Sequence, residues 1–198
     1  MKRIAMLWLL LFVAHNSFSQ LDDRTIHDLK LGHVTRDTSY VYWLPYEPHK
    51  RFLLIQGWAS KFSHNNGELS LDFKMRPGNK IYAAREGIVS DTKEDSNEGG
   101  AKDEYLNKGN YVVIRHSDGS LGGYWHLQKD GALVDKGDTV KKGQLIGLSG
   151  NTGYSAFPHL HFWVYNRDSV LKTYPTRFVT RKGIRYLRPG RSYLSVHQ

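Results

Sequence analysis

The feature that most limits the fold of this chain is a succession of short apolar runs, none of which keeps the 3.6-residue period of a helix. Gly, Pro, Asn or Asp residues bound each run. The runs fall at 53–56, 81–84, 87–90, 111–115, 122–127, 144–148 and 160–165. Runs of this length and spacing are typical of strands joined by turns. The sequence therefore predicts a predominantly β domain, built as an antiparallel sheet or sandwich.

The chain divides into four segments. Residues 1–19 begin with two cations, continue through an apolar stretch and end in small residues, which is the pattern of a secretory signal peptide cleaved after Ser19. The apolar stretch is about half of the roughly 20 residues that a membrane span needs, so an uncleaved anchor is the less favoured alternative. We expect a lead-in segment at 20–50, the main domain at 51–166 and a basic C-terminal tail at 167–198. The mature protein would be exported, periplasmic or extracellular, with no transmembrane segment.

A polar, charge-rich run at 91–108 interrupts the pattern of strands. Its composition cannot bury much apolar surface, and two adjacent glycines lie in its middle. We expect a solvent-exposed excursion between two strands, which is either disordered or a flap over a groove.

Charge and cysteine content limit the partners and the ligands. The formal net charge is +9, from 28 basic and 19 acidic residues, and loss of the signal peptide leaves +7. This balance favours a polyanionic partner, which for an exported protein is an anionic cell-envelope polymer or lipid and not nucleic acid. A basic surface that serves only solubility explains the charge equally well. Because the chain has no cysteine, any metal must be bound by histidine and carboxylate groups.

The strongest chemical signal is Pro-His-Leu-His-Phe at 158–162. On a strand, alternation places His159 and His161 on one face and sends Leu160 and Phe162 to the core. Two imidazoles on an open face can share a metal ion, or one can bind it while the other activates water. Two structural histidines that only form hydrogen bonds are the alternative.

Two further segments present candidate groups. In 69–73 the apolar residues alternate, so Asp72 points away from them, where a buried carboxylate needs a cation or several hydrogen-bond donors. His64 precedes this segment. In the Tyr-Trp-His-Leu segment, alternation predicts that Tyr124 and His126 share one face. A histidine between large residues is more often structural than catalytic, so spacing alone assigns no role to His126.

Taken in order, these motifs resemble the lysostaphin or LytM-type zinc metallopeptidase family. The resemblance also includes Gly-Asn-Thr-Gly at 150–153 and the segments at 77–87, 109–114 and 140–147, and it covers roughly residues 57–166. Separated motifs in the same order are far more specific than any one of them. The resemblance implies the LytM-type fold, the duplicated hybrid motif, with a groove across an antiparallel sheet.

The resemblance also implies which residues act. Zn²⁺ would be bound by His64, Asp72 and His161, and His126 and His159 would be the catalytic imidazoles. Three protein ligands leave one tetrahedral position open, as in catalytic zinc sites. The implied activity is hydrolysis of peptide bonds in the stems or crosslinks of bacterial peptidoglycan.

The spacing of the first two ligands departs from that of the best-known members. There, the first histidine lies four residues before the aspartate, whereas that position here is Glu68, and His64 lies eight residues before Asp72. Similar sequences with Phe-Ser-His before a longer gap favour His64, and Glu68 remains the alternative ligand.

Two other functions stay open from the sequence alone. A non-catalytic module of the same fold could bind the cell wall or activate an amidase. The Lys-Lys-Gly-Gln-Leu-Ile-Gly stretch at 141–147 also resembles a biotinyl or lipoyl carrier hairpin, and paired histidines occur in phosphocarrier domains. The signal peptide counts against this third function.

Overall fold

The structure is a computed structural model, and two predicted features lie outside the residues that it describes, namely the signal peptide and His64. The described residues are 41–58, 60, 68–166 and 173–197, with the isolated positions 24, 27, 28 and 31. No helix within these residues is long and apolar enough to cross a membrane.

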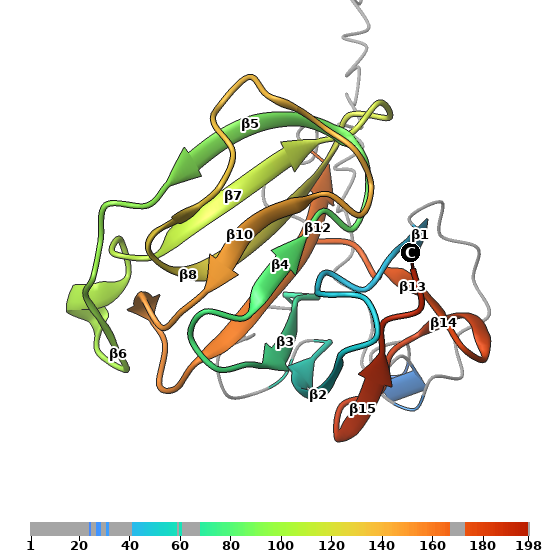
Figure 1. Ribbon diagram of the computed structural model, residues 1–198. Coiled ribbons are helices and arrows are strands. Elements are labelled where there is room, and N and C mark those ends of the chain that lie inside the picture. Colours follow the sequence, from blue (N-terminus) through green and yellow to red (C-terminus); the bar gives the residue numbers. More distant parts are fainter. Residues whose placement is uncertain are drawn as a thin grey trace, which may run out of the picture.

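A ten-stranded sheet in which all neighbours are antiparallel forms the body of the molecule (Figure 1). Its strands are β2 (Arg51–Gly57), β3 (Leu71–Lys74), β4 (Lys80–Tyr82), β5 (Gly87–Lys93), β7 (Asn110–Arg115), β8 (Ser120–Ala132), β9 (Thr139–Val140), β10 (Leu145–Ser149), β12 (His159–Asn166) and β15 (Arg191–Leu194). The main path runs β15-β2-β3-β12-β8-β7-β5-β9, and β10 joins β4 to β8. Every apolar run predicted as a strand overlaps one of these strands, so the prediction of a predominantly β, antiparallel domain is confirmed.

Two smaller sheets complete the described fold. A three-stranded sheet has the order β1-β13-β14, and a parallel pair joins β6 to β11. Their bounds are β1 (Val41–Tyr42), β6 (Gly99–Gly100), β11 (Gly153–Tyr154), β13 (Arg177–Thr180) and β14 (Gly183–Tyr186), and a 3₁₀ turn, η1, spans Asp103–Tyr105. The sequence pattern predicts no strand after residue 165, yet β15 pairs with β2 and extends the main sheet at its edge. The segment expected as a basic tail therefore takes part in the fold.

One part of the core lies between the main sheet and the three-stranded sheet. Phe73 of β3 and Phe162 of β12 are buried on one face of the main sheet. The ring centroid of Phe178, on β13, lies 6.4 Å from that of Phe73 and 5.8 Å from that of Phe162. Tyr42 of β1 also packs against Phe162, at 5.8 Å. Aromatic burial on this face drives the two layers together and leaves the opposite face of β3 and β12 for polar groups.

The polar run at 91–108 leads from β5 to β7 and is largely exposed, as expected, but its middle is paired with another strand. β5 continues through its first three residues, and Gly99–Gly100 pairs with β11. A Cβ atom on Gly99 would lie 1.9 Å from the carbonyl oxygen of Asn151, so only glycine permits this approach. The run therefore supports the loop that precedes β12.

An ion pair fixes the turn between β7 and β8. Arg85 Nη1 donates to Asp118 Oδ2 at 2.6 Å, and the side chain of Asp118 is 36% exposed. Burial raises the pKa of the Asp118 carboxyl, but hydrogen bonds from Ser120 and Arg85 outweigh it and bring the pKa to about 2.

Candidate active site

Asp72, His159 and His161 lie on the face of the main sheet that points away from the core. β3 and β12 pair so that His161 is opposite Asp72 and Leu160 is opposite Phe73. Leu160 and Phe73 are fully buried, so alternation places the three polar side chains on the other face. The predicted division of the Pro-His-Leu-His-Phe motif between two faces is confirmed.

His126 reaches this face through a β-bulge. β7 pairs with β8 so that Asn110 is opposite Leu127 and Tyr111 is opposite Trp125, and the register shifts between these two pairs. His126 is therefore an extra residue on β8, and its φ of 66° lies in the left-handed region, which is uncommon for residues other than glycine. A bulge of this kind redirects a side chain, and here it turns the imidazole toward His159 and His161.

The predicted common face for Tyr124 and His126 is wrong, and the bulge is the reason. Tyr124 is fully buried, and its hydroxyl accepts a hydrogen bond of 2.8 Å from the backbone N–H of Ala84. The ring centroid of His126 instead lies 4.7 Å from that of His159 and 5.7 Å from that of His161. Simple alternation cannot hold across an inserted residue.

The four described candidates form one compact group. One ring nitrogen from each of His126, His159 and His161 lies within 4.8 Å of the other two. Asp72 Oδ1 lies 2.9 Å from Nδ1 of His161 and 3.7 Å from Nε2 of His159. Asp72 is 4% exposed, so its charge is screened little by solvent.

Backbone carbonyls set the tautomers of two imidazoles. Nδ1 of His126 donates to the carbonyl oxygen of Thr152 at 2.7 Å, and Nδ1 of His159 donates to that of Phe157 at 2.8 Å. A carbonyl oxygen only accepts, so Nδ1 carries the hydrogen in both rings. In the neutral rings each Nε2 keeps its lone pair and can accept a proton.

The third imidazole, that of His161, lies between two carboxylates. Asp72 contacts its Nδ1, and Oε1 of Glu68 lies 3.1 Å from its Nε2. Ser70 also donates a hydrogen bond from its hydroxyl to Glu68. Burial lowers the pKa of His161, but the hydrogen bonds and charges of Asp72 and Glu68 outweigh it and raise the pKa to about 10. Two carboxylates that converge on one partly buried ring create a site that favours a cation.

His126 lies in the opposite electrostatic situation. Burial, followed by the charges of His159 and His161, lowers its pKa to about 3, and the hydrogen bond to Thr152 offsets little of this. His126 is therefore neutral at physiological pH, with a lone pair on Nε2.

These donors fit a metal ion of the zinc type. A carboxylate oxygen and an imidazole nitrogen, 2.9 Å apart on neighbouring strands, are the ligand types that zinc takes in sites without cysteine. The three clustered imidazoles form a second set of donors. The first predicted ligand, His64, lies outside the described residues, whereas Glu68 contacts His161 on the ring nitrogen away from Asp72.

Two residues that support the histidines received no role from the sequence. Thr152 orients His126 through its carbonyl, and its hydroxyl both donates to the carbonyl of Leu127 at 2.6 Å and accepts from the N–H of Asn110 at 2.9 Å. The hydroxyl of Ser155 lies 3.2 Å from Nδ1 of His159. The only sequence signal for this loop is the Gly-Asn-Thr-Gly motif, which does not by itself reveal these contacts.

Comparison with known proteins adds independent findings. The model of a family described as Peptidase family M23 matches residues 66–173. The chain is 36% identical over 118 residues to an uncharacterized metalloprotease of Buchnera aphidicola, which covers 60% of this chain and 28% of that protein. It is 42% identical over 91 residues to the peptidoglycan DD-endopeptidase ShyA of Vibrio cholerae. This match covers 46% of this chain and 18% of ShyA. The catalytic domain of lysostaphin from Staphylococcus simulans is 31% identical, with a TM-score of 0.41, over 64% of this chain and 80% of that one. The chain thus spans less than a third of the length of the two curated relatives.

Proposed function

Because the chain belongs to peptidase family M23, we propose that it is an exported, zinc-dependent endopeptidase that hydrolyses peptide bonds in the stems or crosslinks of bacterial peptidoglycan. The observation that carries this proposal is the convergence of Asp72 and His161 with two imidazoles whose Nδ1 atoms donate to backbone carbonyls, which places the lone pair of each neutral ring on Nε2. The name of the related Vibrio protein, a peptidoglycan DD-endopeptidase, supports the choice of substrate. The net positive charge agrees with an anionic wall polymer.

In this proposal Asp72 Oδ1, His161 Nδ1 and His64 hold the metal. A zinc ion bound there would supply Lewis acidity, which would polarise the scissile carbonyl and lower the pKa of water to near neutral. Glu68 then accepts the hydrogen on Nε2 of His161 and fixes the ring, as carboxylates do beside many metal-binding histidines.

The imidazoles of His159 and His126 act in proton transfer and in orienting water or substrate. Nε2 of His159 lies 3.7 Å from Asp72 Oδ1, so the carboxylate stabilises the imidazolium that forms when His159 takes a proton. We therefore assign the general base to His159, which returns the proton to the leaving amine. His126 has a lowered pKa and stays neutral, so its Nε2 accepts a hydrogen bond from water or substrate and orients it.

Two single substitutions test the assignment of roles. The His161→Ala protein should lose both bound zinc and cleavage, because a metal ligand is gone. The His126→Ala protein should keep stoichiometric zinc and lose about 10²- to 10⁴-fold in turnover, the usual contribution of a positioned acid–base group. Zinc content is measured on purified protein by elemental analysis. Wild-type cleavage by His161→Ala would show that the ligand assignment is wrong, and loss of zinc in His126→Ala would favour the three histidines as the metal site.

Digestion of purified sacculi tests the activity itself. We expect soluble muropeptides whose crosslinks or stems are cut, no product in the presence of a chelator, and recovery when zinc is added. Mass spectrometry of the products identifies the bond. Intact sacculi under all conditions, with zinc bound and the protein still attached to the wall, would support the non-catalytic binding module instead.

Export is tested separately. Expression of the full chain in a Gram-negative host, followed by fractionation, should give a periplasmic protein whose first residue is Gln20. Recovery of an uncleaved chain in the cytoplasm would contradict the predicted signal peptide without bearing on the catalytic site.

A further inference from the structure

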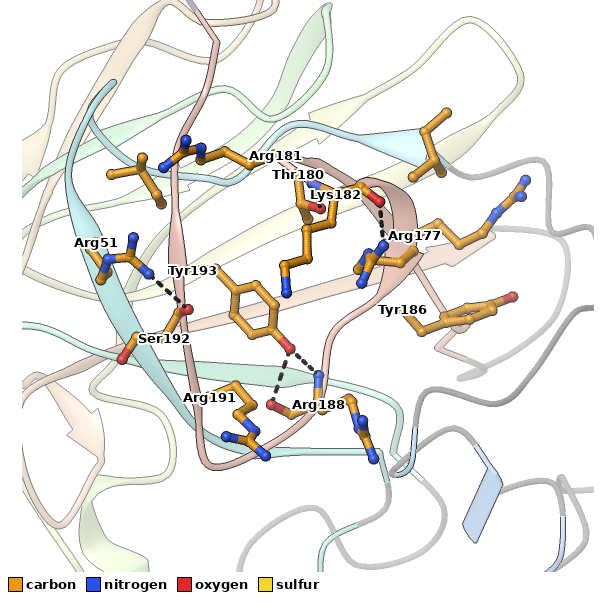
Figure 2. Close-up of a pocket in the computed structure, with 13 residues that line it drawn as sticks. Arg51, Arg177, Thr180, Arg181, Lys182, Tyr186, Arg188, Arg191, Ser192 and Tyr193 are labelled. Atoms are coloured by element: carbon orange, nitrogen blue, oxygen red, sulfur yellow. Dashed lines mark hydrogen bonds between the residues drawn. The ribbon is translucent and has the colours of Figure 1, made fainter.

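A second concave surface lies at the edge of the main sheet, away from the histidines. One wall is formed by β2 and β15, and the other by the β13–β14 hairpin (Figures 1 and 2). The hollow has a volume of about 1220 Å³, and seven of its thirteen lining residues are cationic. We call it the basic hollow, and its exposed cations are Arg51, Arg181, Lys182, Arg185, Arg188 and Arg191.

The six exposed cations of the basic hollow differ from other surface cations in their lack of ion pairs with described residues. Among the residues that the structure describes, no aspartate or glutamate lines it. Within the part of the chain that the structure describes, none of its six exposed cations forms an ion pair, whereas Lys80 and Lys108 elsewhere on the surface pair with Glu47 and Glu98. Like charges that lie near one another repel, and an anionic ligand in the hollow would relieve this repulsion.

Hydrogen bonds within the basic hollow hold its walls in position. The backbone N–H of Arg188 donates to the hydroxyl of Tyr193 at 2.6 Å, which ties the segment after β14 to β15. Arg185 donates from its guanidinium to the carbonyl of Lys182 at the turn of the hairpin. Arg51 donates to the carbonyl of Ser192 at 3.4 Å, and Figure 2 marks this bond. The backbone that presents the cations is therefore fixed by contacts that do not use up their charge.

We propose that the basic hollow binds a linear polymer that carries repeating phosphate groups. Six of the seven cations are arginine, whose planar guanidinium matches two phosphate oxygens at once. Cations lie on both walls, Arg191 on β15 and Arg181 in the β13–β14 hairpin, so a ligand with several anionic groups matches them better than a single anion. A concave surface suits a chain better than a flat bilayer.

The aromatic residues of the basic hollow argue against nucleic acid as the ligand. Tyr186 is 4% exposed, and Tyr193 is partly buried and packs against the hydrophobic core. Neither offers the open ring on which bases stack in single-strand binding proteins. Recognition by charge alone fits a phosphate polymer without bases.

The position of the basic hollow relates it to the histidines. β15 is separated from β3, which carries Asp72, only by β2. At about 4.8 Å between strands, the two lie roughly 10 Å apart within the sheet. A polymer held at β15 would thus keep the enzyme on its wall while the groove acts, although binding does not depend on the proposed activity.

Binding of labelled linear polyphosphate to the full chain tests the proposal, by fluorescence anisotropy at several salt concentrations. The test variant is Arg181→Gln with Arg191→Gln, one substitution on each wall. The matched control is Arg76→Gln with Arg115→Gln, two exposed arginines outside the basic hollow. Both pairs remove the same charge, and thermal unfolding followed by circular dichroism shows that each variant folds.

We expect affinity to fall about 25-fold in the test variant, from roughly fivefold for each cation at an anionic surface. The plot of log affinity against log salt should become shallower by about 1.4, at about 0.7 for each phosphate contact. In the control variant, the affinity and the salt slope should both change much less than in the test variant, because only the net charge of the protein is altered there. An equal loss in both variants, or no loss in the test variant, would overturn the proposal. So would tighter binding to oligothymidine, or to vesicles of phosphatidylcholine and phosphatidylglycerol, than to polyphosphate. Because no turnover is measured, these outcomes are independent of the proposed peptidase activity.

Discussion

Replacing Glu68 with glutamine tests how the second carboxylate serves the metal site. Oε1 of Glu68 lies 3.1 Å from Nε2 of His161, and Asp72 Oδ1 lies 2.9 Å from Nδ1 of the same ring. A neutral imidazole offers a lone pair at only one nitrogen. If Nδ1 and Asp72 face the metal, Nε2 must carry a hydrogen, and Glu68 is placed to accept it.

The magnitude follows from this geometry. Loss of a carboxylate beside a metal-binding histidine weakens metal binding by about 10- to 100-fold, or about 1.4 to 2.8 kcal/mol. The glutamine oxygen of Glu68→Gln still accepts the hydrogen bond but brings no charge, so we expect about tenfold. Zinc affinity is measured by competition with a chromophoric chelator, and turnover should recover at saturating zinc. Glu104→Gln is the control, since Glu104 is 60% exposed and lies 3.7 Å from Lys102 as its ion-pair partner.

Two results would refute this interpretation of Glu68. Unchanged zinc affinity would show that the carboxylate does not hold the imidazole. A loss beyond about 1,000-fold, without recovery in excess zinc, would make Glu68 a direct ligand, because each ligand contributes a large share of the binding free energy. The second result would favour the short spacing between the first ligand and Asp72 over the long one from His64.

Two further predictions concern stability and the loop before β12. The pKa of Asp118 is held below its usual value, so its ionised carboxylate stabilises the fold above about pH 4, and this stabilisation is lost as the pH falls toward 2. Asp118→Asn should lower the free energy of unfolding by about 1 kcal/mol at pH 7, after allowance for the solvent exposure of the pair with Arg85. The free energy measured by urea unfolding should then fall less between pH 4 and pH 2 than in the wild type. An unchanged pH profile would contradict this. Gly153 has a φ of 81°, and a Cβ there would lie 2.6 Å from the Cα of Gly109. Gly153→Ala should therefore lower the free energy of unfolding by about 2–3 kcal/mol. It should also lower turnover, because it displaces the Thr152 carbonyl that orients His126. The control is Gly119, whose φ is 82° and where an added Cβ would meet no atom within 4 Å. Gly119→Ala should lower the free energy of thermal unfolding by about 1 kcal/mol and leave turnover unchanged. If both substitutions lowered turnover equally, the proposed effect of Gly153 on His126 would be refuted.

The sequence was sufficient for those parts of the fold that depend on local alternation. Apolar and polar residues alternate through β3 and β12, so the buried Leu160 and Phe73 and the opposed Asp72 and His161 follow from a period of two. The strands after residue 173 were not predicted because each is only four residues long and includes an arginine, so none of them forms a clear apolar run. Their pairing with β2 and β1 depends on Phe178 entering a core built by distant segments, which no local pattern encodes.

His126 shows why a site can be predicted correctly as a set of residues and wrongly in its geometry. On a regular strand, Tyr124 and His126 point to the same face and Trp125 to the other. Because Tyr124 points to the core, His126 would do so too, and only the shift in register against β7 turns it to the groove. That shift is fixed by Asn110, whose amide nitrogen donates to the carbonyls of Ser96 and Gln128, and by Thr152, which accepts the Asn110 N–H. The residues that hold the bulge therefore come from the 91–108 run, from β7 and from the loop before β12. A backbone conformation that costs about 1–3 kcal/mol can persist only where such separate segments converge on it. The strain at His126 is thus a tertiary property, and it turns one more imidazole toward the group that we propose binds the metal.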